Sequence, residues 1–255
     1  MTLPHVLALV ASSIGAGVMN ALAGGGTILT YPTLLFLGES AIVANATSTV
    51  ALWPGAAASM WGYRREVATH REWLTTLLVP SLLGGAVGAV LLLRTPTKSF
   101  ERLAPFLILF ATLLFLAQGA LSRSSRKAAA QPRSRGRLVA ALLFQFGVAI
   151  YGGYFGAGIG ILMLATLGFL GLSDIHAMNG LKNFFGMCIN AVAAAYFVFR
   201  GAVEWPAALV MTAGAIAGGY GGARFARRIG KAKSRAAVAV IGFGIAIVLF
   251  VRGIR

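Results

Sequence analysis

Long apolar segments dominate the chain and are separated by short polar stretches. They lie near residues 3–13, 41–63, 73–93, 103–121, 138–155, 175–199, 205–223 and 236–251. Most of them approach the ~20 residues that an α-helix needs to cross the hydrocarbon core of a bilayer. Because they are continuously apolar and do not alternate with a period of two, they predict helices and not the strands of a membrane barrel. The pattern therefore predicts an all-α, polytopic membrane protein.

Composition agrees with this fold class. Of the 255 residues, 58% are hydrophobic and 11% are charged, whereas soluble domains carry about 25% charged residues. The first apolar segment lacks the basic residues that begin a signal peptide, so we expect it to stay as the first helix. The single cysteine, Cys188, excludes an internal disulfide and a multi-cysteine metal site, and we expect it to be a buried small side chain.

The net charge of +16 is informative because of where the basic residues lie. In a soluble protein it would indicate a nucleic-acid partner, but here the basic residues gather between the apolar segments, without interleaved aromatic residues. Two groups stand out: Arg123, Arg126, Lys127, Arg133, Arg135 and Arg137, then Arg224, Arg227, Arg228, Lys231, Lys233 and Arg235. Such clusters are typical of cytoplasmic loops of membrane proteins. We therefore expect membrane lipid around the protein and no nucleic-acid partner.

An internal repeat is visible at a fixed offset. A shift of 134 residues aligns ALAGGGTIL with FGAGIGILM, Asn45 with Asn179, and GGAVGA (84–89) with GGYGGA (218–223). We interpret this as a first membrane repeat over 1–121, a basic cytoplasmic linker over 122–137 and a second repeat over 138–255. With the basic segments in the cytoplasm, equivalent helices point in opposite directions. This predicts two inverted repeats, as in many secondary transporters, with both termini in the periplasm.

Each repeat carries a glycine cluster within its first apolar region, at 24–26 and 156–160, and the shift pairs Gly24 with Gly158 and Gly26 with Gly160. Residues 3–37 and 138–171 are each short for two full spans. We therefore expect each repeat to contain a pair of short helices broken at the glycines, then three full transmembrane helices. Breaks at matching places point to a substrate site near the midplane, where free helix N-termini attract an anion. Close helix packing is the alternative for these clusters and the expected role of Gly84, Gly88, Gly218 and Gly222.

Polar residues inside apolar segments complete the candidate site, because they are costly in a bilayer. Lys182 shares a helix face with Asn179 and Asn183 and would supply a positive charge; the alternative is that it extends to the cytoplasmic surface. The matching segment of the first repeat carries Asn45, Thr47, Ser48 and Thr49. Asn20 and Gln145 would either face the substrate or cap the broken helices. The predicted substrate-binding residues are Asn20, Gly24, Gly25, Gly26, Asn45, Thr47, Ser48, Gln145, Gly156, Gly158, Gly160, Asn179, Lys182 and Asn183.

Motifs for catalysis and cofactors are missing from the sequence. GAGIGI lacks the preceding strand of a dinucleotide-binding unit, and no phosphate-binding loop of an ATPase occurs. The six acidic residues leave no paired carboxylates within the apolar segments. We expect no enzymatic activity, no cofactor and no metal. Asp174 and His176 would cap a helix or, alternatively, couple protons to transport.

Three stretches carry a resemblance to a known family. GAGVMNALAGGGTILTYPTLLFLG, ANATSTVALWPGAAASMWGYRRE and GGYFGAGIGILMLATLGFLGLSDIHAMNGLKNF resemble the two signature regions of the TauE/SafE family of sulfite exporters. The resemblance spans nearly the whole chain. It implies a permease of the bacterial inner membrane for small sulfur-containing anions, such as sulfite or organosulfonates. Together with the glycine breaks, the resemblance favours transport by alternating access, driven by an ion or potential gradient. A passive anion channel is the alternative. The sequence favours no oligomeric state.

Overall fold

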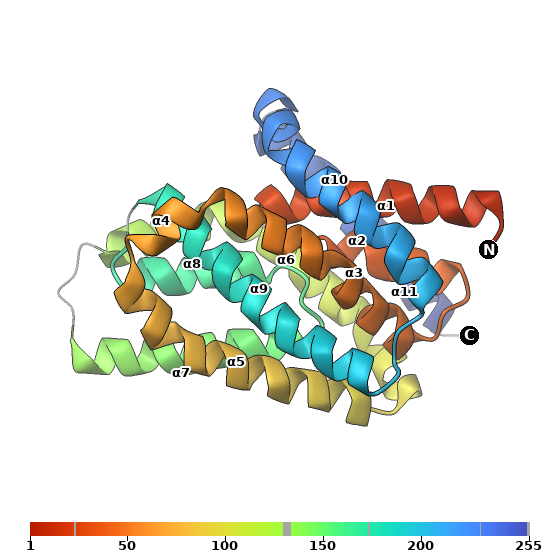
Figure 1. Cartoon of the computed structure of the whole chain (residues 1–255), viewed down its shortest axis with the longest axis horizontal. Coiled ribbons are helices and arrows are strands. Elements are labelled where there is room, and N and C mark those ends of the chain that lie inside the picture. Colours follow the sequence, from red (N-terminus) through yellow and green to blue (C-terminus); the bar gives the residue numbers. More distant parts are fainter. Residues whose placement is uncertain (23, 130–133, 173, 230, 254–255) are drawn as a thin grey trace.

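The protein is a bundle of α-helices (Figure 1). The computed structural model describes residues 1–22, 24–129, 134–172, 174–229 and 231–253, and their side chains except at 21–22, 62, 66, 119–129, 222–229, 231–238 and 252–253. Within these ranges no strand occurs, and the all-α prediction is confirmed. The helices are α1 (Leu3–Leu22), α2 (Thr27–Phe36), α3 (Ala41–Gly62), α4 (Arg64–Ala68), α5 (Arg71–Arg94), α6 (Thr97–Ala129), α7 (Arg135–Tyr154), α8 (Ile159–Phe169), α9 (Ile175–Phe199), α10 (Trp205–Ile229) and α11 (Lys231–Gly253).

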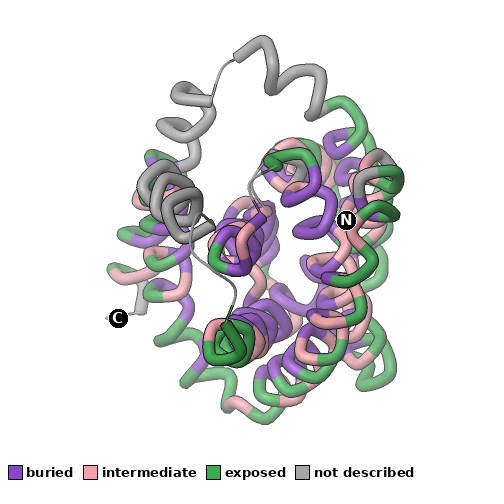
Figure 2. The backbone as a smooth tube through the Cα atoms, turned by 90° about the vertical axis from the view of Figure 1, so that its left-hand side faces the viewer, coloured by how far each residue is buried: buried purple, intermediate pink, exposed green. Residues whose placement is uncertain are grey.

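Five of these helices, α1, α5, α6, α7 and α9, are long and apolar enough to cross a membrane within the described residues. Their outward faces are apolar: along α5, Val79 and Leu83 are 59% and 58% exposed, and along α6, Phe106 is 56% exposed. Buried positions lie between the helices and exposed ones on the outside of the bundle (Figure 2). A belt of exposed large apolar side chains fits contact with lipid. The protein is therefore a multi-pass membrane protein.

The glycine clusters divide the chain differently from the prediction. We expected two short helices in each repeat, but α1 and α7 have 20 residues each, and only α2 and α8, with 10 and 11 residues, are short. The expectation was wrong because each region is divided unequally, into one helix long enough to span and one short helix, and Ser12 and Ser13 do not interrupt the first. Their hydroxyls instead donate to the carbonyls of Leu9 and Val10 one turn earlier, so α1 continues through them. Three helices of at least 22 residues then follow in each half, and α5, α6 and α9 among them are apolar enough to span within the described residues.

Helix packing is matched between the two halves. Helix α1 packs against α10 and α7 against α5, while α3 contacts α10 and α9 contacts α5. Small residues make these contacts close: a Cβ on Gly84 would lie 2.6 Å from the Cβ of Ala149 in α7, and one on Gly218 would meet the backbone of Ile14 in α1. Gly84, Gly88 and Gly218 therefore pack helices together, as expected. The surroundings of Gly222 are outside the part of the structure that is described.

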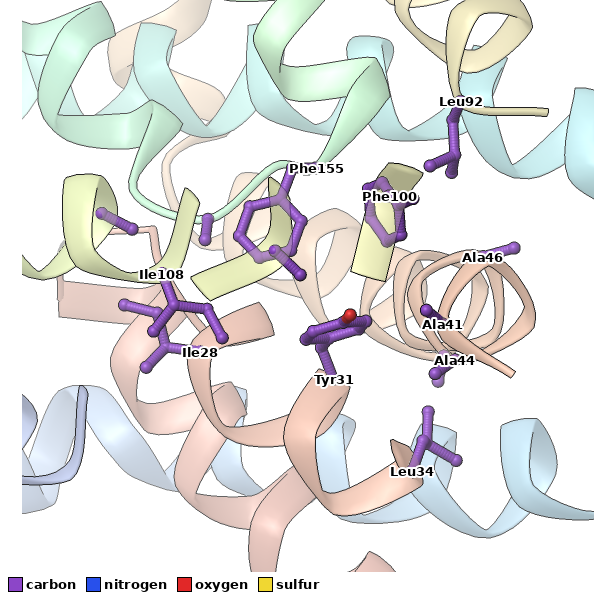
Figure 3. Packing of buried hydrophobic residues seen from close by; sticks show 14 of the residues in the cluster. Ile28, Tyr31, Leu34, Ala41, Ala44, Ala46, Leu92, Phe100, Ile108 and Phe155 are labelled. Atoms are coloured by element: carbon purple, nitrogen blue, oxygen red, sulfur yellow. The ribbon is translucent and has the colours of Figure 1, made fainter. Parts of the chain in front are cut away.

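Aromatic packing holds the short helix α2 in the core. The Tyr31 ring lies edge-on to Phe155, which follows α7, and to Phe100 of α6, with centroid distances of 5.5 and 6.1 Å (Figure 3). Edge-to-face pairs of this kind add about 0.5–1.5 kcal/mol beyond the burial of their area. The cluster therefore ties α2 to the region where α7 ends, and so joins the two halves of the chain.

Candidate functional site

A cavity of about 50 Å³ lies where the two glycine breaks meet α3 and α9. A water molecule needs roughly 10–15 Å³ on this measure, so the space suits a small ion with a few waters. Residues from both halves surround it. Its lining is formed by Asn20, Gly24, Thr27, Thr49, Leu52, Ala56, Ser59, Gly156, Ile159, Gly160, Met163, Lys182, Asn183, Gly186, Met187 and Asn190.

The two breaks begin with the same turn. Gly24 and Gly156 have φ angles of +74° and +82°, which favour glycine, and their N–H groups donate to the carbonyls of Met19 and Tyr151, five residues earlier. This geometry ends α1 and α7. Gly26 and Gly158 then form the N-caps of α2 and α8. The helix ends therefore correspond as Gly24 with Gly156 and Gly26 with Gly158, two residues from the pairing that the sequence alignment predicted.

Lys182 supplies the positive charge of the cavity. It is 2% exposed, and its Nζ has no hydrogen-bond partner among the described residues. The next residue, Asn183, is 8% exposed, and its Nδ2 is also unpartnered. The Lys182 side chain lies inside the protein and does not extend to a membrane surface. Since buried donors nearly always have partners, two free donors facing one cavity point to an acceptor-rich ligand.

Asn20 has both of the roles that the sequence left open. Its Oδ1 accepts a hydrogen bond of 2.8 Å from the N–H of Gly26, so it caps α2, and the residue also lines the cavity. The cap satisfies one of the free N–H groups at the start of α2. Asn20 is thus a lining residue of the cavity that also holds the start of α2.

The other predicted polar residues lie away from the cavity. Asn45 donates through Nδ2 to the carbonyl of Tyr154, the Thr47 hydroxyl accepts from the N–H of Glu204, and Gln145 donates to the Ser81 hydroxyl, each at 2.9 Å. The Ser48 and Thr30 hydroxyls pair with each other. The first two contacts and the Ser48–Thr30 pair tie α3 to the end of α7, to the start of α10 and to α2, and the Gln145–Ser81 bond ties α7 to α5. The predicted residues that do not line the cavity are Gly25, Gly26, Asn45, Thr47, Ser48, Gln145, Gly158 and Asn179.

Three polar lining residues were missed by the sequence analysis: Thr27, Ser59 and Asn190. A signal for Asn190 was present, because it follows Asn183 by seven residues and so lies on the same face of α9, two turns further along. Thr27 directly follows the triple glycine. Ser59 had no distinguishing pattern in the sequence.

Asp174 caps α9, since its Oδ1 accepts a hydrogen bond of 2.9 Å from the N–H of His176. It lies outside the central cavity, beside a separate pocket of about 230 Å³ that also contains His70 and Glu72. No carboxylate occurs among the residues that line the central cavity. The chemistry available there is one ammonium group, amides, hydroxyls and backbone groups.

Comparison with known proteins identifies the family. The model of the sulfite exporter TauE/SafE family matches residues 9–249. A probable membrane transporter protein of Haemophilus influenzae is 31% identical over 89% of this chain and 88% of its own length. The probable membrane transporter proteins YfcA of Escherichia coli (strain K12) and ORF9 of a Sinorhizobium species are 28% and 25% identical, covering 89% and 95% of this chain and 82% and 92% of their own lengths. No solved structure matches the chain. With nearly the whole chain matched, and with transporters among its relatives, the protein is a membrane transporter that belongs to the TauE/SafE sulfite exporter family.

Proposed function

We propose that the protein carries small sulfur-containing anions, such as sulfite or organosulfonates, across the bacterial inner membrane. The observation that carries this proposal is Lys182, which lines the central cavity and whose buried ammonium group has no hydrogen-bond partner among the described residues. An anion bound there would pair with this charge and accept hydrogen bonds from Asn183 and Asn20. Such charge-assisted hydrogen bonds contribute roughly 1.5–3 kcal/mol each.

The helix N-termini support an anion as the ligand. Helix α8 begins at the cavity with Gly158 as an N-cap that makes no side-chain hydrogen bond, and Ile159 and Gly160 line the cavity. The first N–H groups of a helix have no partner within it, and its N-terminus carries a partial positive charge. A compact oxyanion would therefore gain from the start of α8 as well as from Lys182.

An inverted repeat is the arrangement that we infer for the two halves. At an offset close to 134 residues, α1 corresponds to α7, α3 to α9 and α5 to α10. The packing of α1 on α10 then matches that of α7 on α5, and α3 meets its own counterpart α9. This is the contact pattern of a two-fold axis that passes between α3 and α9. The membrane repeats would be residues 1–121 and 138–255, joined by the basic linker 122–137.

The arginine distribution sets the orientation that we propose. Arg64 and Arg65 lie on α4, at the opposite end of the bundle from the start of α1 (Figure 1), and Arg71 and Arg135 begin α5 and α7. Basic residues accumulate in cytoplasmic loops. Both termini would accordingly face the periplasm.

Alternating access driven by an ion or potential gradient is the mechanism that the two similar halves favour, because exchange of their conformations opens a central site to each side in turn. A passive anion channel would use the same cavity and the same lysine. Proteoliposomes distinguish the two: a carrier saturates with sulfite and exchanges labelled for unlabelled anion by counterflow. A channel produces single-channel current and no counterflow. The proposal predicts that Lys182→Met loses saturable sulfite flux and that Lys98→Met, a substitution on the protein surface, keeps it. If the wild type itself does not transport sulfite, the proposal is overturned.

A further inference from the structure

Three oxygen atoms lie around Gly156, at the break that ends α7. From the point that a Cβ on Gly156 would occupy, the carbonyl oxygen of Gly152 is 3.1 Å away, the Thr27 Oγ1 3.9 Å and the Asn190 Oδ1 4.0 Å. Gly156 has no side chain to fill this space. The oxygens come from α7, α2 and α9, and Gly156, Thr27 and Asn190 all line the cavity.

None of these oxygens is used by the fold. The N–H groups of Phe155 and Gly156 both donate to the carbonyl of Tyr151, so the turn bypasses the carbonyl of Gly152. Across the described residues, no donor bonds to that carbonyl, and neither the Thr27 hydroxyl nor the Asn190 amide has a hydrogen-bond partner. These oxygens are therefore free to accept from, or to coordinate, a ligand of the cavity.

We propose that Gly152, Thr27 and Asn190 bind a monovalent cation with the chemistry of Na⁺, and that this cation accompanies the anion through the transporter. Carbonyl, hydroxyl and amide oxygens are the ligands that hard cations prefer. All three are neutral, which suits a single positive charge. The C-terminus of α7, with its partial negative charge, points toward the same place, and unwound carbonyls at broken helices serve this purpose in other transporters.

The positive groups nearby do not exclude the cation. Helix α2 begins at Thr27, but Asn20 caps its N-terminus through the N–H of Gly26. Lys182 lies nearer the start of α9: Asn183 and Asn190 are seven residues apart, which is about 10 Å at 1.5 Å per residue. An anion held at Lys182, Asn183 and the start of α8 would offset the positive charge of these groups and attract the cation.

A proton is a poor alternative at this place, because amide, hydroxyl and carbonyl oxygens do not take up a proton near neutral pH. The cation site itself stands on the three oxygens, and only its coupling to the anion rests on the proposed function. A gradient of this cation across the membrane would then drive transport.

Thermal unfolding of the full-length protein in detergent tests the site without any transported anion. In the wild type, replacing choline chloride by NaCl at constant ionic strength should raise the midpoint, since a ligand of the folded state stabilises it. Thr27→Val and Asn190→Ala should each require at least about tenfold more Na⁺ for half of this rise. Thr33→Val is the matched control: it lies on the same helix, and its hydroxyl donates to the carbonyl of Leu29. It should respond to Na⁺ as the wild type does.

A wild type that is stabilised equally by choline and Na⁺ would overturn the proposal, and so would an unchanged Na⁺ response in Thr27→Val. If Asn190→Ala does not fold, Asn190→Asp replaces it. A carboxylate at this position should lower the required Na⁺ by about tenfold, and no change would count against the site. Calorimetry with sulfite in NaCl and in choline chloride then separates the two proposals. Sulfite binding that ignores Na⁺ overturns the coupling alone, whereas Na⁺ stabilisation without sulfite binding overturns the proposed substrate alone.

Discussion

Gly24 and Gly160 lie backbone against backbone at the centre of the bundle. A Cβ on Gly24 would be 3.1 Å from both the N and the Cα atom of Gly160. The first residue ends α1 in the first half of the chain, and the second lies in the first turn of α8 in the other half. The two glycine breaks are therefore parts of one structure, and a side chain on Gly24 would press on the backbone of Gly160.

Gly24→Ala should impair the protein for two additive reasons. The φ of +74° disfavours any residue with a Cβ, at a cost of about 1–3 kcal/mol, and the Cβ would press on Gly160. We expect a lower thermal midpoint and loss of anion flux. Gly147→Ala is the control, because it lies within α7 with no atom within 4 Å of its Cβ position; it should be neutral or stabilising. Normal flux in Gly24→Ala would contradict the close contact of the breaks.

Gly25 has a different neighbour, since a Cβ there would meet the ring of Phe115 in α6. The residue is buried and does not line the cavity, so a substitution disturbs packing and does not fill the ligand space. Gly25→Ala should therefore lower the thermal midpoint, because overpacking costs about 1–3 kcal/mol. In a Phe115→Ala background the same change should cost little. Equal losses in the two backgrounds would mean that the residues are not coupled.

Lys182 should govern anion affinity. Lys182→Met should raise the Kd for sulfite about tenfold to a hundredfold, which corresponds to the roughly 1.5–3 kcal/mol of a charge-assisted hydrogen bond. Lys182→Arg should keep part of the affinity, because the charge stays while the geometry of the donors changes. Calorimetry on monodisperse protein measures both, with the exposed Lys98→Met as the control. An unchanged Kd in Lys182→Met would leave the helix N-termini as the only positive groups of the site.

Two exposed positions test the orientation. In a Cys188→Ser background, a cysteine at Lys98, in the first turn of α6, should react with an impermeant maleimide added to intact spheroplasts. A cysteine at Ala68, at the end of α4, should react only after lysis. Both side chains are exposed, so a difference in labelling reports the side of the membrane. The reverse pattern would invert the proposed topology.

Glu39, in the loop between α2 and α3, should make stability depend on pH. Burial, and then the negative charge of Glu204, raise the pKa of Glu39 above its ordinary value. The folded state therefore holds this proton more tightly than the unfolded chain, and stability falls as pH rises from the unfolded pKa through the folded one. Glu39→Gln should raise the thermal midpoint at neutral pH and change it little near about pH 4, below both pKa values. If the thermal midpoint rises equally at both pH values, the effect does not arise from the charge of Glu39.

Much of the fold was predictable from the sequence, because the bilayer leaves few choices. A segment such as 71–94 must be helical in hydrocarbon, since nothing else satisfies its backbone, and its length alone indicates a span. The glycine clusters and the fixed offset likewise located the breaks, and Lys182 was identified because an isolated charge in an apolar helix is costly. These features depend on local composition, so they can be recognised without knowing how the helices pack.

The lining of the cavity was decided by the tertiary structure. Asn45, Thr47 and Gln145 are as polar as Asn183, yet each finds a partner in a distant segment of the chain, at Tyr154, Glu204 and Ser81. Which polar group bonds to its neighbours and which stays free depends on how helices far apart in the chain pack together. From the order of the residues alone one can infer the two glycine breaks, the isolated charge of Lys182 and the resemblance to the family. Only the packing of one half on the other determined that Gly24 meets Gly160, and that Lys182 and Asn183 are left with donors free for a ligand.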